Sequence, residues 1–223
     1  MASGPRSRLK VGMAKVKVAA GLAVLAPIIT FAAVLLTRNG IVSLDFGLDV
    51  LTLQVAQVVA WFALGFAVLT VALSAPQFAR LGLVSIVILL VCVGVAAAFF
   101  VQSRAIAVEG PLDVSTDIAE APAVPGARGT PQACPGVAGV MTQVAPARAT
   151  EALQAAGFSI TEAQLFRARG VRDGFWFGMG HEAHVRIRPG RTDVRVVARY
   201  DHSDGGKTCR IAAQVVAALQ PAS

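Results

Sequence analysis

Residues 81–103 read LGLVSIVILLVCVGVAAAFFVQS, an uncharged run that lies between Arg80 and Arg104. A bilayer core is crossed by about 20 apolar helical residues, so this run is long enough to span it. Two further uncharged runs precede it, and the whole chain is 55% hydrophobic and only 15% charged, which is too apolar for an ordinary soluble domain. We therefore predict three transmembrane helices, at about residues 18–37, 50–73 and 81–102.

The first apolar run follows a basic leader, RSRLKVGMAKVK, at residues 6–17. A cleaved signal peptide is the alternative interpretation, but its apolar run would be about 7 to 15 residues long and would end at a small-residue cleavage site. The run here is longer, and no clear site of that kind follows it. The leader holds five basic residues and no acid: Arg6, Arg8, Lys10, Lys15 and Lys17. The positive-inside rule therefore predicts a cytoplasmic tail at residues 1–17, and three crossings then place residues 104–223 outside.

The formal net charge of +7 is concentrated in the same leader, which contributes +5, whereas residues 18–103 sum to zero and residues 104–223 contribute +2. A basic segment beside an apolar run reflects membrane topology and contact with anionic lipid. We therefore expect the lipid bilayer as a partner and no nucleic acid.

The apolar runs carry no Asp, Glu, Lys, Arg or His deep in a span, although a proton or ion path usually needs such groups. A pump or transporter is therefore not predicted. Small residues recur four positions apart, a spacing suited to close packing within the bundle or against a partner. These pairs are Ala19 with Ala23, Ala63 with Ala67, and Gly94 with Ala98.

Residues 104–223 mix polar and apolar residues and are long enough for one hydrophobic core. Two stretches have helical spacing, VAPARATEALQAAGF at 144–158 and KTCRIAAQVVAALQP at 207–221. Strand patterns lie between them, SITEAQLFRAR at 159–169 and the alternating EAHVRIRPGRTDVRVVARY at 182–200. With a strand ahead of the first helix, the order is strand, helix, three strands, helix. We predict an α+β fold, in which the transmembrane bundle precedes a small antiparallel sheet with helices on one face.

The last strand pattern contains a Pro-Gly pair and is predicted to form a hairpin. If that pair is the centre of the turn, Arg186 lies opposite Asp193, and His184 lies opposite Arg195. One face of the hairpin is then charged and mostly basic. It is either a solvated face with one cross-strand ion pair or a docking surface for an anion or a partner.

The segment GHEAHV at 180–185 resembles a metal-binding pattern, but two residues separate His181 from the second histidine of the pair, His184, where a zinc-protease helix needs three. On a strand, the two side chains would point to opposite faces. No metal site, no cofactor and no catalytic residue is predicted, and an enzyme is the less favoured class.

The segment GGKT at 205–208 matches the end of a phosphate-binding loop, in the expected position before a helix. Asp201 stands where the first glycine of that loop belongs, and Asp204 would repel a phosphate. We therefore expect no nucleotide. Ser203 or Asp204 is instead expected to cap the last helix.

Two cysteines lie in the same region, Cys134 in a loop rich in Pro, Ala and Gly, and Cys209 near the start of the last helix. Outside the cytoplasm such a pair usually forms a disulfide. The bond would stabilise the fold by about 4 kcal/mol in the chain-entropy model. The sequence leaves the bridged and the free states open, because it does not show whether the two α-carbons are close.

Three segments resemble the domain of unknown function 1499 family over about residues 108–220: DVSTD at 113–117, FWFG at 175–178 and DVRVVARYDHSD at 193–204. Members tend to show D-V-R-S-x-S-R-x-G-x-S-D-x-G in the last segment. The matching positions are Asp193, Val194, Arg195, Arg199, Ser203, Asp204 and Gly206. The resemblance implies a bacterial envelope or chloroplast protein and no established reaction.

The chain departs from the family pattern at several of these positions. Val196 and Ala198 stand where members tend to have serines, and Asp201 replaces a glycine. His181 and Glu182 stand where members tend to have paired aspartates. If the pattern marks a ligand site, this chain is expected to have lost part of it.

Taken together, the sequence predicts a membrane-anchored accessory or interaction protein of the bacterial inner membrane, whose periplasmic domain binds a membrane or periplasmic protein partner. The alternative is a periplasmic ligand-binding or hydrolytic domain. The candidate binding residues are Asp113, Asp117, Asp193, Arg195, Arg199, Ser203 and Asp204. The alternative requires that these side chains converge on one concave site.

Overall fold

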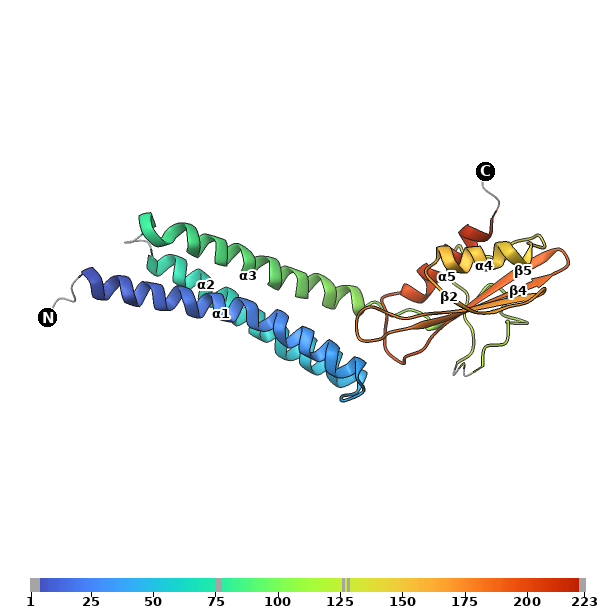
Figure 1. Ribbon diagram of the computed structural model, residues 1–223, viewed down its shortest axis with the longest axis horizontal. Coiled ribbons are helices and arrows are strands. Elements are labelled where there is room, and N and C mark those ends of the chain that lie inside the picture. Colours follow the sequence, from blue (N-terminus) through green and yellow to red (C-terminus); the bar gives the residue numbers. More distant parts are fainter. Residues whose placement is uncertain (1–4, 75–77, 126, 128, 221–223) are drawn as a thin grey trace. The chain divides into compact units, whose positions relative to one another are not determined.

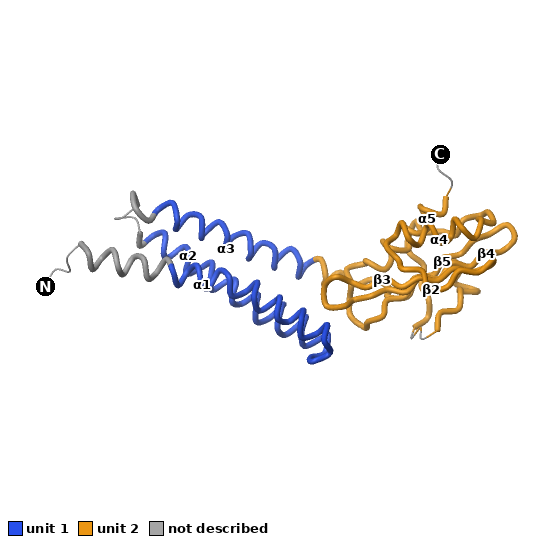
Figure 2. The backbone as a smooth tube through the Cα atoms, in the orientation of Figure 1, with its two compact units in different colours: residues 1–104 blue, residues 105–223 orange. Residues whose placement is uncertain are grey.

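The computed structural model describes residues 5–74, 78–125, 127 and 129–220, with the side chains of 5–16, 73–74 and 78–81 excepted. The chain forms two compact units (Figures 1 and 2), which divide between Arg104 and Ala105. The sequence-based prediction divided the chain one residue earlier, between residues 103 and 104. The side chains of the predicted basic tail up to residue 16 lie outside the described part, as do residues 75–77 of the second predicted loop.

The first unit consists of long apolar helices. They are α1 (Pro5–Arg38), the π-helix η1 (Phe46–Ala56), which continues as α2 (Gln57–Ser74), and α3 (Phe78–Ile106). Among the described residues three stretches are long and apolar enough to cross a membrane: Lys17–Arg38, Phe46–Ala72 and Gly82–Ile106. They match the three predicted spans to within a few residues at each end.

Small residues form the packed interior of this unit. Of the predicted pairs, Ala19 with Ala23 and Ala63 with Ala67 are buried, as expected for residues that let helices approach closely. In α3 Cys92 and Ala96 are buried, two positions earlier than the predicted pair Gly94 and Ala98, which is exposed.

Large apolar side chains are exposed along all three spans. Phe31, Phe62, Leu83 and Leu90 are among them. A continuous apolar surface of this extent is unfavourable in water and compatible with lipid. The first unit is therefore suited to association with a membrane.

The second unit contains one antiparallel sheet of strand order β1-β5-β4-β3-β2 and two helices. Its elements are β1 (Asp113–Ser115), α4 (Pro146–Ala155), β2 (Ser159–Ala163), β3 (Arg167–Arg172), β4 (His181–Arg188), β5 (Arg191–Ala198) and α5 (Lys207–Leu219). Both helices contact the sheet on one face and each other (Figure 1). The predicted α+β fold is confirmed.

One predicted strand is in fact a hairpin. The segment 159–169 divides into β2 and the start of β3, and the backbone N–H of Gln164 donates to the carbonyl of Arg167 at 2.8 Å to close the turn. The turn residues Leu165 and Phe166 are exposed. Because the turn holds no Gly, Pro, Asn or Asp, the sequence offered no turn signal there.

The hydrophobic core lies between the sheet and the helices. Alternate strand residues such as Val185 and Val196 meet Leu153 of α4 and Ile211 and Val215 of α5, all of them buried. These helix residues lie in the two stretches that were predicted as helices from their spacing. The opposite face of every strand is consequently turned away from the helices.

Candidate functional site

The sheet face opposite the helices is built from the polar residues of the strands. The β4–β5 register places Arg186 opposite Asp193 and His184 opposite Arg195, which confirms the register predicted from the Pro-Gly turn. The segment that follows β1, residues 116–122, is hydrogen-bonded to side chains on this face. The charged face is therefore covered by the chain itself.

A buried ion pair joins β1 to β5 at one side of this face. The guanidinium of Arg195 donates from Nε to Oδ1 of Asp113 at 2.9 Å and from Nη2 to Oδ2 at 2.6 Å. Its remaining Nη1 donates to the carbonyl oxygen of Pro122 at 2.9 Å. This planar, two-pronged arrangement is the geometry that Arg forms with carboxylates. Arg195 thus holds both the first strand and the covering segment in place.

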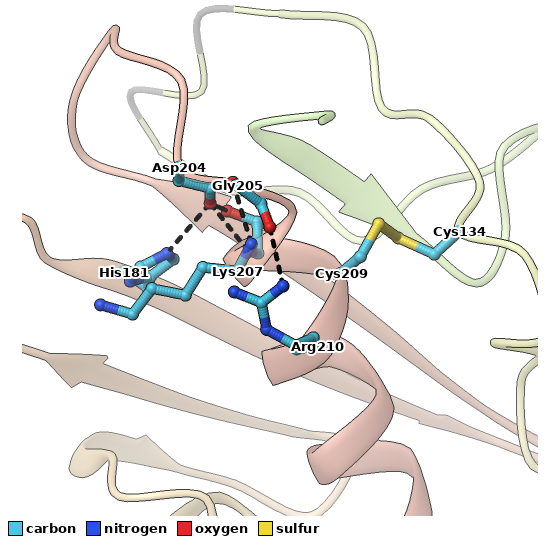
Figure 3. The surroundings of a disulfide bond; sticks show 8 residues. Cys134, His181, Asp204, Gly205, Lys207, Cys209 and Arg210 are labelled. Atoms are coloured by element: carbon cyan, nitrogen blue, oxygen red, sulfur yellow. Dashed lines mark hydrogen bonds and ion pairs between the residues drawn. A yellow bond between two sulfur atoms is a disulfide. The ribbon is translucent and has the colours of Figure 1, made fainter. Parts of the chain in front are cut away.

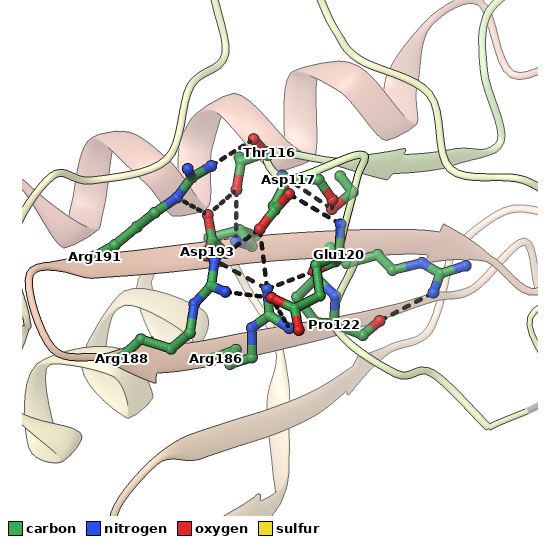
Figure 4. Close-up of polar contacts among 11 residues, drawn as sticks. Thr116, Asp117, Glu120, Pro122, Arg186, Arg188, Arg191 and Asp193 are labelled. Atoms are coloured by element: carbon green, nitrogen blue, oxygen red, sulfur yellow. Dashed lines mark hydrogen bonds and ion pairs between the residues drawn. The ribbon is translucent and has the colours of Figure 1, made fainter.

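Asp193 is the centre of a second cluster (Figure 4). Its side chain is completely buried, and its carboxylate accepts hydrogen bonds from Arg188 at 2.6 Å and from Arg191 at 2.7 Å. The hydroxyl of Thr116 lies 3.4 Å from the same carboxylate, and Arg186 lies 3.6 Å from it. A buried carboxylate needs such partners, because removing it from water without them costs several kcal/mol.

The covering segment adds two more acids to this cluster. Asp117 accepts from Arg188 at 2.7 Å and from Arg186 at 3.2 Å, and Glu120 accepts from Arg188 at 2.6 Å. The backbone N–H of Glu120 also donates to Asp117 at 3.1 Å, which closes a tight turn. This backbone hydrogen bond, helped by Arg188 and Arg191, lowers the pKa of Asp117.

A third group of pairs lies on β2, β3 and β4. Arg169 donates to Glu162 and to Glu182, each at 3.1 Å, and the imidazole of His184 lies 2.8 Å from Glu182. Burial lowers the pKa of His184 although Glu182 favours its protonated form. His184 is therefore held as a neutral side chain within the ion-pair network.

Charge on this face is balanced. Among the described residues, six arginines and six carboxylates take part, and each makes at least one ion pair. They are Arg167, Arg169, Arg186, Arg188, Arg191 and Arg195 with Asp113, Asp117, Glu120, Glu162, Glu182 and Asp193. The hairpin alone is basic, as predicted, but the assembled face is neutral. In the described part of the chain this face holds many ion pairs and not the single one of the first interpretation, and its arginines are paired with carboxylates.

Asp204 caps α5. Its carboxylate accepts from the backbone N–H of Lys207 at 2.9 Å, and from the backbone N–H and the hydroxyl of Thr208 at 2.8 and 2.6 Å (Figure 3). Burial opposes ionisation, but these hydrogen bonds, together with His181 at 3.8 Å, outweigh it, so the pKa of Asp204 lies well below its usual range. Of the two predicted caps, Asp204 is the correct one, because Ser203 donates to carbonyls of residues 106–108 instead.

His181 and Tyr200 extend this cluster into the interior. The hydroxyl of Tyr200 lies 3.0 Å from Nε2 of His181 and donates to Asp204 at 3.3 Å. Burial lowers the pKa of His181, and burial together with the charge of Asp204 raises the pKa of Tyr200. His181 shares the helix-side face with the core, whereas His184 lies on the polar face, so the two histidines point in opposite directions as predicted.

Arg199 lies apart from the ion pairs of the polar face and from the Asp204 cluster. Its side chain is half exposed and lies 3.6 Å from the carboxylate of Asp173. It lines an open cleft of about 730 Å³ at the β1 edge of the sheet. The cleft is formed by residues 110–113 and 197–201 together with Val124, Pro125, Ala127, Gly129, Thr130, Gln132 and Glu182.

The seven candidate residues therefore divide among three places. Asp113, Asp117, Asp193 and Arg195 come together beneath the covering segment, where arginines neutralise the carboxylates. Ser203 and Asp204 precede α5, and Arg199 lines the cleft. Asp113 is the only candidate that contributes to both the ion-pair network and the cleft in the described part of the chain. Among the described residues, no group of three or more potential metal ligands occurs.

The two cysteines form a disulfide bond, with their α-carbons 5.7 Å apart (Figure 3). This resolves the alternative that the sequence left open. The bond attaches the loop before α4 to the first turn of α5, on the side of the sheet that holds the hydrophobic core.

Comparison with known proteins adds no relative. No family model matches the chain, and no curated protein and no solved structure matches it. Fold and site alone define the class to which it is assigned here: an α+β domain joined to apolar helices that suit a membrane.

Proposed function

We propose that this chain is a membrane-anchored accessory or interaction protein of the bacterial inner membrane, and that its C-terminal domain binds a protein partner in the periplasm. Three helices of sufficient length and apolar character support the anchor. Five basic residues ahead of the first helix support a cytoplasmic N-terminus. Three crossings then place the second unit outside the cytoplasm.

The disulfide supports the same compartment independently. Disulfides persist in oxidising surroundings and are rare in the cytosol of most organisms. The Cys134–Cys209 bond lies in the unit that the charge rule places outside, whereas Cys92, in an apolar helix, is a free thiol. Charge distribution and cysteine chemistry therefore favour one orientation.

The open cleft beside Arg199 carries the binding role, and the neutralised sheet face weighs against the hydrolytic alternative. Reactive acids and bases need a substrate within reach, but Asp193 is fully buried and Asp113 is occupied by Arg195. The hydrolytic or ligand-binding alternative requires these groups to be available and consequently has less support. The cleft near Arg199 remains open, and we propose it as the contact surface for a segment of the partner.

The resemblance to the domain of unknown function 1499 family supports the fold proposed for the second unit, and it carries no argument about a reaction. Its matching residues Arg195 and Asp204 form a strand-to-strand ion pair and a helix cap. The shared pattern therefore has a structural explanation that involves no ligand. We propose membership of that family on the basis of residues 193–204.

Site-specific photo-crosslinking in the native membrane tests the partner-binding role. A photoreactive side chain at Thr130 or at Arg199 probes the cleft, and one at exposed Leu165 is the matched control. We expect one discrete protein adduct from both cleft positions and none of that size from Leu165. Absence of an adduct from the cleft, or equal adducts from all three positions, would contradict the proposal.

A further inference from the structure

We propose that the loop between β3 and β4, residues 173–180, inserts its exposed aromatic side chains into the membrane interface and so fixes the second unit against the bilayer. The proposal rests on the membrane anchoring proposed above. The partner of this loop is the lipid bilayer, and the side chains that enter it are those of Phe175 and Trp176.

The loop presents two aromatic side chains outward and anchors itself with a third. Phe175 is 76% exposed and Trp176 is 56% exposed, and their rings contact edge to face with centroids 5.2 Å apart. The next residue, Phe177, is buried and adopts a left-handed backbone with φ +54°. A non-glycine residue in this conformation is costly and usually has a role. Here this backbone conformation turns the ring of Phe177 into the domain, while the rings of the two preceding residues are exposed.

Within the second unit, the base of the loop is joined by short contacts to residues 106 and 108, where the chain enters this unit. The carbonyl of Gly180 accepts from the backbone N–H of Arg199 at 2.9 Å, and His181 contacts Tyr200. A few residues later, Ser203 donates to the carbonyls of residues 106 and 108, at 2.9 and 3.0 Å. All these contacts lie within the second unit. They join the loop to the point at which the chain leaves its apolar span, Gly82–Ile106.

The end of that span carries features of a membrane interface. The guanidinium of Arg104 lies 4.8 Å from the ring centre of Phe100, and Val108 is an exposed apolar residue two positions after the span ends. Trp and Tyr are enriched at the headgroup level, where an apolar ring with a polar group is best accommodated. Trp176 lies at the end of the domain where residues 105–108 enter it, and it has the chemistry of an interfacial anchor.

Charges around the loop are mixed, so apolar insertion and not attraction to anionic lipid is the driving force. Arg172 and Lys207 lie near the loop, and burial together with repulsion from Arg172 and Arg210 lowers the pKa of Lys207. Arg199 adds a third cation, and the acids Asp173, which lies 3.6 Å from it, and Asp201 partly offset these charges. Insertion is accordingly expected into uncharged phosphatidylcholine bilayers.

The β2–β3 turn provides a natural control. Leu165 is 72% exposed and Phe166 is 61% exposed, so this turn is as apolar as the proposed anchor. It precedes β3, whereas the 173–180 loop follows it. Six strand residues separate the two by about 20 Å. The turn therefore lies at the end of the strand away from the span exit.

Tryptophan quenching by spin-labelled lipids tests the insertion in the full-length protein, reconstituted into phosphatidylcholine vesicles. The chain holds two tryptophans, so W61F leaves Trp176 alone and W176F leaves Trp61 in its apolar span alone. The control chain W61F/W176F/F166W places the single indole in the β2–β3 turn. A non-reducing gel reports the Cys134–Cys209 bond, and hence folding, in each variant.

We expect Trp61 to be quenched by a label deep in the acyl chains, Trp176 to be quenched by a label near the headgroups, and the indole of F166W to be quenched by neither. If Trp61 is quenched but Trp176 is quenched no more than the F166W control, the loop does not insert and the inference is wrong while the anchor stands. If Trp61 is not quenched, the membrane anchoring fails as well. Equal quenching of Trp176 and the control would also overturn the inference, because it would show no preference between the two ends.

Discussion

The sheet of the second unit is covered on one face by α4 and α5 and, over β4 and β5, on the other face by residues 116–122. The two sides are held together by different interactions. The helix side buries apolar side chains such as Leu153, Val185 and Val196, whose attraction is non-directional. The opposite side pairs six arginines with six carboxylates, so each charge depends on a particular neighbour. A short segment with few apolar residues can cover a sheet in this way.

The difference predicts where the fold is sensitive to single changes. An apolar core loses the buried area of a side chain when it is truncated and can partly relax around the gap. A buried ion-pair network that loses one member leaves the opposite charge without compensation. The polar face should therefore depend strongly on its central residue and weakly on its exposed ones.

The disulfide is expected to make the largest single contribution, on the helix side. Its removal in C134S/C209S should lower the free energy of unfolding of the second unit by about 4 kcal/mol, because the bond closes a long loop in the unfolded chain. Urea unfolding in detergent, followed by Trp176 fluorescence in a W61F background, measures this value. C92S is the matched control, since Cys92 is a free thiol in the first unit, and it should leave the second unit unchanged. A loss no larger than that of C92S would show that the bond does not stabilise the domain.

On the polar face, D193N is expected to have the next largest effect. It removes the charge that Arg188 and Arg191 contact, and breaking a buried pair in this way costs about 3 kcal/mol. The control E120Q alters a residue whose side chain is 71% exposed, so its cost should stay below about 1 kcal/mol. The same unfolding measurement compares the two. If both variants cost equally little, the covering segment is held by something other than its ion pairs.

The features of the sheet that follow from strand alternation could be predicted from the sequence. The Pro-Gly turn and the alternating pattern fixed which residues of β4 and β5 face each other, including Arg186 with Asp193. They could not reveal that Asp117 meets Arg188, which lies 71 positions away, because the covering segment has no periodic pattern to fix its path. The neutral face was therefore missed, although its basic half was recognised.

The same limit explains the remaining differences. Ser203 and Asp204 both precede α5, and only the direction of each side chain decides which one is the cap. Tyr200 was not nominated, since its role depends on His181 from a neighbouring strand. The exposed turn at Leu165 and Phe166 was not predicted, because its sequence contains no residue typical of turns. Local spacing predicted elements, whereas contacts between distant segments determined the site.

Removing the cap of α5 should have a smaller effect than the two changes above. D204A deletes the acceptor for the first free N–H groups of the helix and is expected to cost about 2 kcal/mol. D204N retains an oxygen that can cap and should cost less than half as much. Urea unfolding of the two variants in parallel provides the measurement. Equal losses would mean that the charge next to His181, and not the cap, is what stabilises this end of the helix.

Acidification is expected to produce the smallest effect and to act on both faces through their histidines. Burial holds the pKa of His181 and of His184 below the ordinary value of about 6.5, so the unfolded chain takes up a proton more readily than the folded one. The stabilisation is therefore complete above that value and is lost as the pH falls below it. The free energy of unfolding should therefore decrease as the pH falls below about 6.5.

The two histidines have different charged neighbours, and this makes the pH response a comparison of the two faces. His181 is faced by Asp204, Lys207 and Arg172, and His184 by Glu182, Arg169 and Arg195. H181Q and H184Q should each flatten the dependence of unfolding free energy on pH, because glutamine does not titrate. His181 is the more deeply buried of the two, so H181Q should flatten it more. If H184Q flattens the pH dependence of the unfolding free energy more than H181Q does, desolvation is stronger on the ion-paired face. If neither variant changes this dependence, the carboxylates cause the acid sensitivity.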